Sequence, residues 1–177
     1  YSFQAIKHFT CGDGGAIITN NKILAKKIFH LSTVFKKKTL NGFIHPEIGY
    51  NSRMPSLNAS LGLAQVRNLK KIKFQKKKLF LLYNRVISNF SGLKLFKEHK
   101  FTDSNYWLQV LILEGKNKKL RDNIVREGVR QNFRVSTTWK LASSLKPYKN
   151  KQKMDLTGSK KIYDSILCLP SGGGVIF

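Results

Sequence analysis

Acidic residues are scarce in this sequence. Its 177 residues include 9 aspartates and glutamates but 33 lysines and arginines, which gives a formal net charge of +24 at pH 7. The carboxylates are spread out, so no close pair indicates the acid and base chemistry of a hydrolase. The lysines are scattered, with no recognisable nucleic-acid module around them. A solvated lysine-rich surface is the favoured interpretation, and a protein that binds nucleic acid or an anionic surface is the alternative.

Cysteine, histidine and long apolar runs are also scarce. Cys11 and Cys168 have neither metal-ligand nor disulfide-framework spacing, which predicts buried free thiols. No metal site is expected, because metal-ligand spacing is missing among the four histidines, which are His8, His30, His45 and His99. The apolar run 110–113 is far shorter than the ~20 residues of a membrane-spanning helix. With no secretory signal pattern either, we expect a cytoplasmic protein without membrane contact.

The two ends of the sequence indicate a piece of a larger protein. The chain begins at Tyr1 rather than methionine and stops just after a glycine run. We therefore expect a longer protein, truncated at both ends.

The apolar pattern predicts alternating strands and helices. Residues 16–19 read as a buried strand, Asn20 or Asn21 can cap the helix that follows, and residues 34–48 read as a loop. Pro55 then opens the longest helical pattern, which reaches about residue 90 if it is continuous. The later segments predict a strand at 106–113, a helix at 118–129, a strand at 133–136, a helix at 155–166 and a strand at 166–169. We expect an α/β chain in which residues 1–55 end a large domain and residues 56–177 form a linking helix and a small α+β domain.

Lys7 is the candidate for a reactive amine. It stands between a polar and aromatic segment and the glycine cluster 12–15, which leads into the predicted strand. Glycines allow a tight turn and a close approach of the backbone to a ligand, and the strand would anchor the lysine. On these residues alone, a solvated loop lysine is the more common interpretation.

Two longer motifs carry a family resemblance. The first is Ser2-Phe3, then Lys7, then the run Thr10-Cys-Gly-Asp-Gly-Gly-Ala-Ile-Ile-Thr-Asn20, and the second is Gly49-Tyr-Asn-Ser-Arg-Met54 with the segment 59–65 behind it. Together they resemble the cofactor-lysine segment and the second hallmark of the DegT/DnrJ/StrS sugar aminotransferases. The segments 104–107, 134–139 and 169–171 are similar to the branch of that family related to legionaminic acid and bacillosamine synthesis.

The resemblance implies a fold type I enzyme that uses pyridoxal 5'-phosphate. Lys7 matches the lysine that binds the cofactor aldehyde and moves the proton, a role that suits a desolvated amine. Ser2 matches the serine that binds the cofactor phosphate. Asn51 matches the asparagine that reaches this phosphate from the neighbouring subunit of a dimer. Without the resemblance, Ser2 and Asn51 would read as ordinary polar residues of a strand end and a turn.

Three further residues are weaker candidates for binding the substrate. Arg53 can face the diphosphate of a sugar nucleotide, or it can pair with Glu47 at a helix entry. His45 and Tyr50 lie close to the second motif. The substrates implied by the resemblance are an amino acid, glutamate above all, as donor and a nucleotide-linked keto-deoxy sugar as acceptor, for the synthesis of surface polysaccharide.

The resemblance also implies what this stretch does not contain. In the family, the aspartate that keeps the pyridine nitrogen protonated precedes the lysine, and a neutral pyridine stabilises a carbanion poorly. We therefore expect this chain not to transaminate unaided. A catalytically inactive partner subunit is the remaining alternative within the family.

Overall fold

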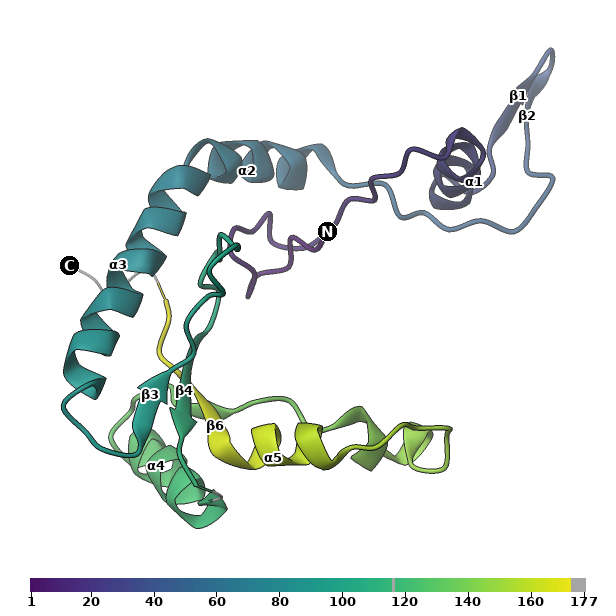
Figure 1. The fold of residues 1–177 in the computed structure, drawn as a ribbon. Coiled ribbons are helices and arrows are strands. Elements are labelled where there is room, and N and C mark those ends of the chain that lie inside the picture. Colours follow the sequence, from purple (N-terminus) through teal and green to yellow (C-terminus); the bar gives the residue numbers. More distant parts are fainter. Residues whose placement is uncertain (116, 173–177) are drawn as a thin grey trace. The chain divides into compact units, whose positions relative to one another are not determined.

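The computed structural model describes residues 1–115 and 117–172, and it divides into two compact units, Tyr1–Leu69 and Lys70–Phe177. We call these unit 1 and unit 2 and describe each by itself (Figure 1). The predicted domain boundary after residue 55 concerns the domains of a whole enzyme and stays a prediction.

Unit 2 is built on a four-stranded antiparallel sheet. Its strands stand in the order β3-β4-β6-β5, which are Leu93–Leu95, Gln109–Leu113, Ile166–Leu169 and Ser136–Thr137. The two longest strands are adjacent, and Leu111 pairs with Leu167. In β4 the burial of side chains alternates along the strand, as expected where one face meets a core. The strand predicted at 166–169 is confirmed, whereas β4 is shorter than the predicted 106–113 and β5 lies largely beyond 133–136.

Three helices complete unit 2. They are α3 (Leu69–Ile87), α4 (Lys118–Arg130) and α5 (Thr157–Ser165), and two 3-10 turns (Ala142–Ser144 and Lys146–Tyr148) precede α5. The predicted helices at 118–129 and 155–166 are thus confirmed to within a few residues. Asn117 caps α4, because its side-chain oxygen accepts the backbone N–H of Leu120 at 2.9 Å.

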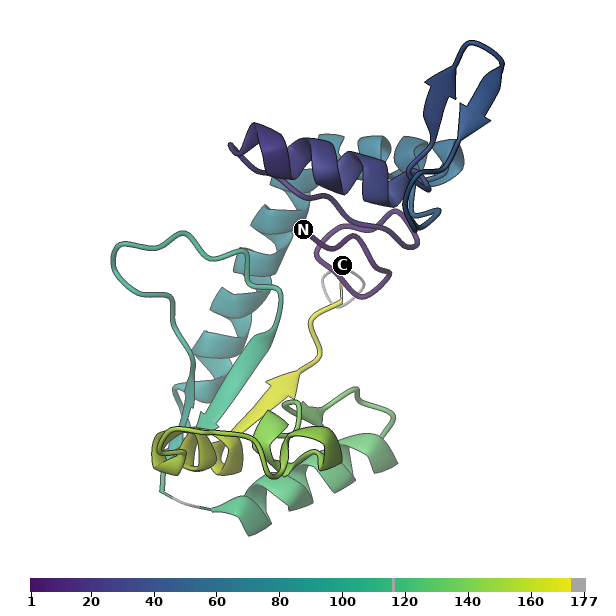
Figure 2. The same ribbon diagram turned by 90° about the vertical axis from the view of Figure 1, so that its right-hand side faces the viewer.

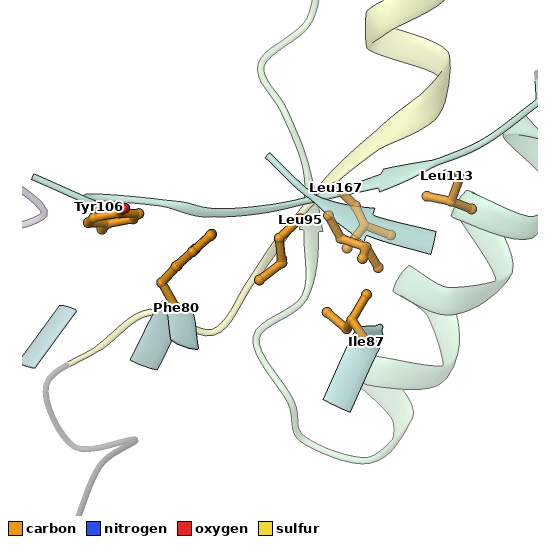
Figure 3. Close-up of a cluster of buried hydrophobic side chains, with 7 residues drawn as sticks. Phe80, Ile87, Leu95, Tyr106, Leu113 and Leu167 are labelled. Atoms are coloured by element: carbon orange, nitrogen blue, oxygen red, sulfur yellow. The ribbon is translucent and has the colours of Figure 1, made fainter. Parts of the chain in front are cut away.

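The core of unit 2 lies between α3 and the sheet. Figure 3 shows Phe80 and Ile87 of α3 facing Leu95 and Leu167 from the strands. The ring of Tyr106 packs at 4.8 Å from that of Phe80. Tyr106 has a φ of 49°, and burial and a hydrogen bond to Glu98 raise its pKa to about 12.

Three polar side chains connect the outer segments of unit 2. The guanidinium of Arg121, a buried residue of α4, donates to the carbonyl of Tyr163 in α5 at 2.5 Å and to Asp122 at 2.6 Å. The segment after β6 is held by α3, because the hydroxyl of Tyr83 donates to the Pro170 carbonyl at 2.9 Å and Lys76 donates to the Ser171 carbonyl.

Unit 1 contains α1 (Lys22–Ser32), a hairpin of β1 (Lys37–Thr39) and β2 (Gly42–Ile44), and α2 (Ser56–Arg67). Asn21 caps α1, since its side chain accepts the N–H groups of residues 23 and 24 at 3.0 Å. Figure 2 shows the hairpin projecting beyond the C-terminal end of α1. The hairpin replaces part of the predicted loop 34–48. Its strands of three residues are too short to show an alternating pattern in the sequence.

Two predictions for secondary structure are wrong. Residues 16–19 form no strand, and Ile17 and Ile18 are exposed. Ala16 exchanges backbone hydrogen bonds with Tyr1, but no backbone ladder with other described residues continues this pairing beyond Ala16. The long helix is broken at Asn68, between α2 and α3. The side-chain amide of Asn68 donates to the Ala64 carbonyl at 3.1 Å. Such a bond from an asparagine side chain to nearby backbone competes with the regular backbone hydrogen bonds of a helix.

Candidate functional site

The first sixteen residues form a loop that closes on itself. The terminal amine of Tyr1 donates to the Ala16 carbonyl at 2.7 Å, and the N–H of Phe3 donates to the Gly14 carbonyl at 2.9 Å. Ser2 forms an antiparallel bridge with Gly15 between these two bonds. The motif that carries Ser2 and the glycine cluster therefore come together as the base of one loop.

Lys7 lies on the far side of this loop, in a bend. The N–H of Cys11 donates to the Phe3 carbonyl at 3.1 Å, so the chain between these residues forms a closed excursion. Within it, the N–H of Lys7 donates to the Gln4 carbonyl at 2.9 Å. Lys7 is half-buried in this bend.

The glycine cluster is required by the geometry at the base of the loop. Gly14 has a φ of 127°, a conformation that side-chain-bearing residues rarely adopt. At Gly15, a Cβ atom would stand 2.6 Å from the Tyr1 carbonyl oxygen. The predicted strand is absent. The glycines permit a close approach of two backbone segments, whereas the predicted approach of the backbone to a ligand stays a prediction.

Cys11 joins the loop to α2. Only 1% of its surface is exposed, and its carbonyl accepts the side-chain amide of Asn58 at 2.6 Å. A Cβ atom on Gly62 would lie 3.2 Å from the Cβ of Cys11, so this glycine lets the loop approach the helix. Sequence reasoning did not assign a role to Asn58 or Gly62. Their spacing of four residues, which places both on one helix face, was the available signal.

The second motif folds against the end of α1. The N–H of Tyr50 donates to the Leu31 carbonyl at 2.6 Å, and Asn51 forms an antiparallel bridge with Thr33. His45 belongs to the same group, since its Nδ1 lies 2.8 Å from the Val34 carbonyl oxygen. Three of the predicted site residues, His45, Tyr50 and Asn51, are thus assembled around one turn.

The turn around which they assemble is strained. Val34 and Phe35 have φ angles of 54° and 51°, which is unusual for a β-branched and for an aromatic residue. Gly49 passes so close to them that a Cβ atom would lie 2.7 Å from the Phe35 nitrogen. Strain of this kind persists where the surroundings fix it, and it is concentrated at functional sites.

The candidate residues therefore fall into two groups in unit 1. Ser2 and Lys7 belong to the closed loop, whereas Tyr50 and Asn51 belong to the turn at the end of α1. Arg53 is exposed and lies between that turn and α2. The side chains of Ser2, Tyr50 and Asn51 are exposed as well, while their backbones are fixed by hydrogen bonds.

Residues 1–115 and 117–172 contain neither a metal-ligand cluster nor a membrane-spanning helix. Within these residues, histidine, cysteine, aspartate and glutamate form no group of three suited to a metal ion. None of the helices described is long and apolar enough to cross a membrane.

Comparison with known proteins decides the family. Residues 1–175 match the sequence profile of the DegT/DnrJ/EryC1/StrS aminotransferase family. The chain belongs to this family. The resemblance found in the two sequence motifs is thereby confirmed over nearly the whole chain.

Individual members of the DegT/DnrJ/EryC1/StrS family show the same relationship. GDP-perosamine synthase of Vibrio cholerae is 31% identical over 130 residues, which cover 71% of this chain and 34% of that protein. The aminotransferase TlmJ of Streptoalloteichus hindustanus superposes with a TM-score of 0.88 at 21% identity, over 98% of this chain and 46% of TlmJ. PseC of Helicobacter pylori, an aminotransferase involved in pseudoaminic acid biosynthesis, superposes with a TM-score of 0.88 at 20% identity, over 97% of this chain and 47% of PseC.

These superpositions confirm the fold type I architecture, of which this chain contains about half. The chain spans less than half the length of the curated relatives and solved structures it matches, for example 45% of the EpsN protein of Bacillus subtilis.

Proposed function

We propose that this chain is the lysine-bearing part of a pyridoxal-phosphate-dependent aminotransferase. The enzyme would transfer an amino group from an amino acid, glutamate above all, to the keto carbon of a nucleotide-linked keto-deoxy sugar, in the cytoplasm, for surface polysaccharide synthesis. The observation that carries the proposal is the half-buried Lys7 in the bend of a closed, glycine-based loop. The family membership supplies the reaction class.

The residues present fit pyridoxal 5'-phosphate in chemical type. The amine of Lys7 suits the aldehyde of the cofactor, and the hydroxyl of Ser2 and the side-chain amide of Asn51 suit its phosphate. Both polar side chains are exposed, and their backbones are already paired with Gly15 and Thr33. They can therefore turn toward an anion without breaking a backbone bond.

When bound, the cofactor would supply the electron sink that makes a carbanion next to nitrogen accessible. Lys7 would hold the cofactor through Nζ and would then carry a proton on that same atom, as general base and general acid. The bend that contains Lys7 limits the positions the amine can take, which favours proton transfer over a short path.

The remaining candidates would bind the sugar nucleotide and a second subunit. Arg53, exposed before α2, would hold the diphosphate through charge-assisted hydrogen bonds. His45 and Tyr50 would contact the sugar from the turn at the end of α1. Asn51 would act across the interface of a homodimer, reaching the phosphate held by Ser2 of the partner.

The test begins with the coding sequence upstream of Tyr1, read in the same frame and expressed together with this chain. The protein is incubated with pyridoxal 5'-phosphate, reduced with borohydride and mapped by mass spectrometry. We expect the phosphopyridoxyl label at Lys7, although the chain has other lysines that are more exposed. Incubation with glutamate should then convert the bound cofactor to its amine form.

The control is the Lys7→Arg variant, which keeps the charge but cannot bind the aldehyde. Labelling spread over lysines in proportion to their exposure, unchanged in Lys7→Arg, would refute the role of Lys7. Labelling at Lys7 without any conversion by glutamate would refute the aminotransferase reaction and would favour the inactive partner subunit.

A further inference from the structure

The bend that contains Lys7 belongs to a closed stretch of chain, residues 3–11, which we call the lysine excursion. A backbone hydrogen bond joins its two ends, because the N–H of Cys11 donates to the Phe3 carbonyl at 3.1 Å. The rings of Phe3 and Phe9 also meet near this closure, with their centroids 5.1 Å apart. The position of Lys7 in unit 1 therefore depends on what holds the joined ends of the excursion.

Cys11 anchors these joined ends. It is the only buried residue among residues 1–69, all of which are described, and 1% of its surface is exposed. Its thiol donates to the Asp13 carbonyl at 3.0 Å. Its own carbonyl accepts the side-chain amide of Asn58, a residue of α2, at 2.6 Å. Figure 1 shows the N-terminal loop, in purple, beside α2. Cys11 thus connects the lysine excursion to a helix.

Glycines on both sides allow this contact between the loop and α2. A Cβ atom on Gly62 would lie 3.2 Å from the Cβ of Cys11, and one on Gly12 would lie 3.3 Å from the amide nitrogen of Asn58. Asn58 and Gly62 are four residues apart, so they share one face of the helix. Because Cys11 is buried, a loss of the hydrogen bond to its carbonyl would be costly, and the amide of Asn58 therefore holds it in place.

We propose that Asn58 is a positioning residue for the amine of Lys7. By holding the Cys11 carbonyl, Asn58 fixes the joined ends of the lysine excursion against α2 and limits the positions that Nζ of Lys7 can take. Chemistry at an amine depends on such limits, because a small displacement of the reacting group slows the reaction. The proposal rests on the proposed function of Lys7. It adds a residue that acts on the lysine through Cys11, without touching the reacting atoms.

The test variant is Asn58→Leu, which keeps the shape of the side chain and the net charge but removes the hydrogen-bond donor. It is made in the chain expressed together with its upstream coding sequence, as in the labelling experiment. The first measurement needs no cofactor, and it is the rate at which iodoacetamide alkylates each cysteine, followed by mass spectrometry. Cys11 should react at least about tenfold faster in the variant, because the lost hydrogen bond favours local opening. Cys168 in unit 2 should react at an unchanged rate.

The second measurement reports on the lysine itself. Pyridoxal 5'-phosphate held at Lys7 gives visible circular dichroism, and the size of this signal depends on how firmly the ring is oriented. The dichroism, divided by the absorbance of the bound cofactor, should decrease in Asn58→Leu. The share of the phosphopyridoxyl label found at Lys7 should decrease as well. Asn58→Gln keeps the amide on a longer side chain and should restore both signals at least in part.

The matched control is Asn68→Leu. Asn68 follows the last residue of α2, and its side-chain amide also donates to a carbonyl, that of Ala64, at 3.1 Å. The control makes the same chemical change at the other end of α2, and it should leave the alkylation of Cys11 and the dichroism unchanged. Equal changes in both variants would show that any loosening of α2 is sufficient, and would overturn the proposal.

Two other outcomes would also overturn it. Unchanged alkylation of Cys11 in Asn58→Leu would mean that this hydrogen bond does not hold the lysine excursion. Faster alkylation with unchanged dichroism would mean that Asn58 stabilises the loop without positioning the lysine. A failure of the proposed function looks different, because the unaltered protein would then carry no label at Lys7. The positioning role would fall with it, whereas the alkylation rates would still show whether Asn58 holds the excursion.

Discussion

Unit 1 and unit 2 differ in how they are held together. Unit 2 has a closed apolar core, whose members include Leu113 and Leu167 with 2% and 0% of their surface exposed. In residues 1–69, all of which are described, only Cys11 is buried, and α1 and α2 contain no buried residue. Unit 1 relies instead on backbone hydrogen bonds and glycine contacts. Yet every candidate site residue lies in unit 1.

The unit that has the apolar core is thus not the unit that contains the candidate site residues. Apolar burial is the main favourable term in folding, so unit 2 has the contacts needed to fold as a cooperative body. Unit 1 exposes apolar side chains such as Ile17, Ile23 and Leu57. Surface of this kind marks an interaction face. The motif-bearing half of the chain is therefore expected to gain order from contacts with other protein, and the following predictions test this contrast.

The largest effect is expected in the core of unit 2. Leu167→Ala should lower the free energy of unfolding by about 2–5 kcal/mol, because it removes a fully buried side chain and leaves a cavity. Both tryptophans lie in unit 2, so urea unfolding followed by tryptophan fluorescence reports on this unit. The matched variant Leu40→Ala removes a fully exposed leucine of unit 1 and should leave the transition within about 0.5 kcal/mol. Equal effects would contradict the contrast.

The second effect is a pH dependence confined to unit 2. The pKa of Tyr106 is raised to about 12 by burial and by its hydrogen bond to Glu98, from 10.0 in an unfolded chain. The folded state therefore favours the neutral phenol, and this contribution is complete below pH 10 and is lost between about pH 10 and 12. The difference in unfolding free energy between the unaltered protein and Tyr106→Phe should shrink by about 1–3 kcal/mol over that range. A constant difference would show that Tyr106 titrates normally.

The third effect is local to unit 1. Gly15→Ala places a methyl group against the Tyr1 carbonyl and should open the base of the loop, at a cost of about 1–3 kcal/mol. Reductive labelling of Lys7 by pyridoxal 5'-phosphate should then decrease, while the tryptophan-detected unfolding of unit 2 stays unchanged. The control is Gly42→Ala in the hairpin, where a Cβ meets nothing within 4 Å although φ is 134°. This control should preserve the labelling, and if it abolishes labelling as well, the loop is not specifically responsible.

The smallest effect is a gain of stability. Gly158 lies in the first turn of α5, where a Cβ would meet nothing within 4 Å, so Gly158→Ala should stabilise unit 2 by about 0.5–1 kcal/mol. Gly128→Ala in α4 is the opposite case, since its Cβ would lie 2.9 Å from the Cγ2 of Val135. It should destabilise the same unit in the same unfolding experiment.

Local signals made much of unit 2 predictable. Asn117 and the amphipathic pattern behind it define α4, and the apolar run 166–169 finds a partner strand within the chain. The predicted strand 16–19 has an equally apolar pattern, but among the described residues its pairing stops at Ala16, and an apolar pattern alone does not supply a partner strand. The break at Asn68 depends on one side chain turning back to a carbonyl, which an apolar stripe does not reveal.

The sequence predicted which residues are candidates for the site, but not which of these residues lie together. The motifs identify Lys7 and Asn51 as candidates through a family resemblance. The closed loop and the strained turn at Val34 arise from backbone contacts between segments far apart in sequence, for which composition and periodicity carry no signal. The proposed roles of these residues stay predictions until the labelling experiment is done.

The attachment of Pro170 and Ser171 to α3 has a consequence for how this protein can be rearranged. Lys76 of α3 and Ser171 after β6 touch, so two segments near opposite ends of the described part of unit 2 lie side by side. A module whose first helix and last strand are joined in this way can be circularly permuted with a short connection and little disturbance of its interior.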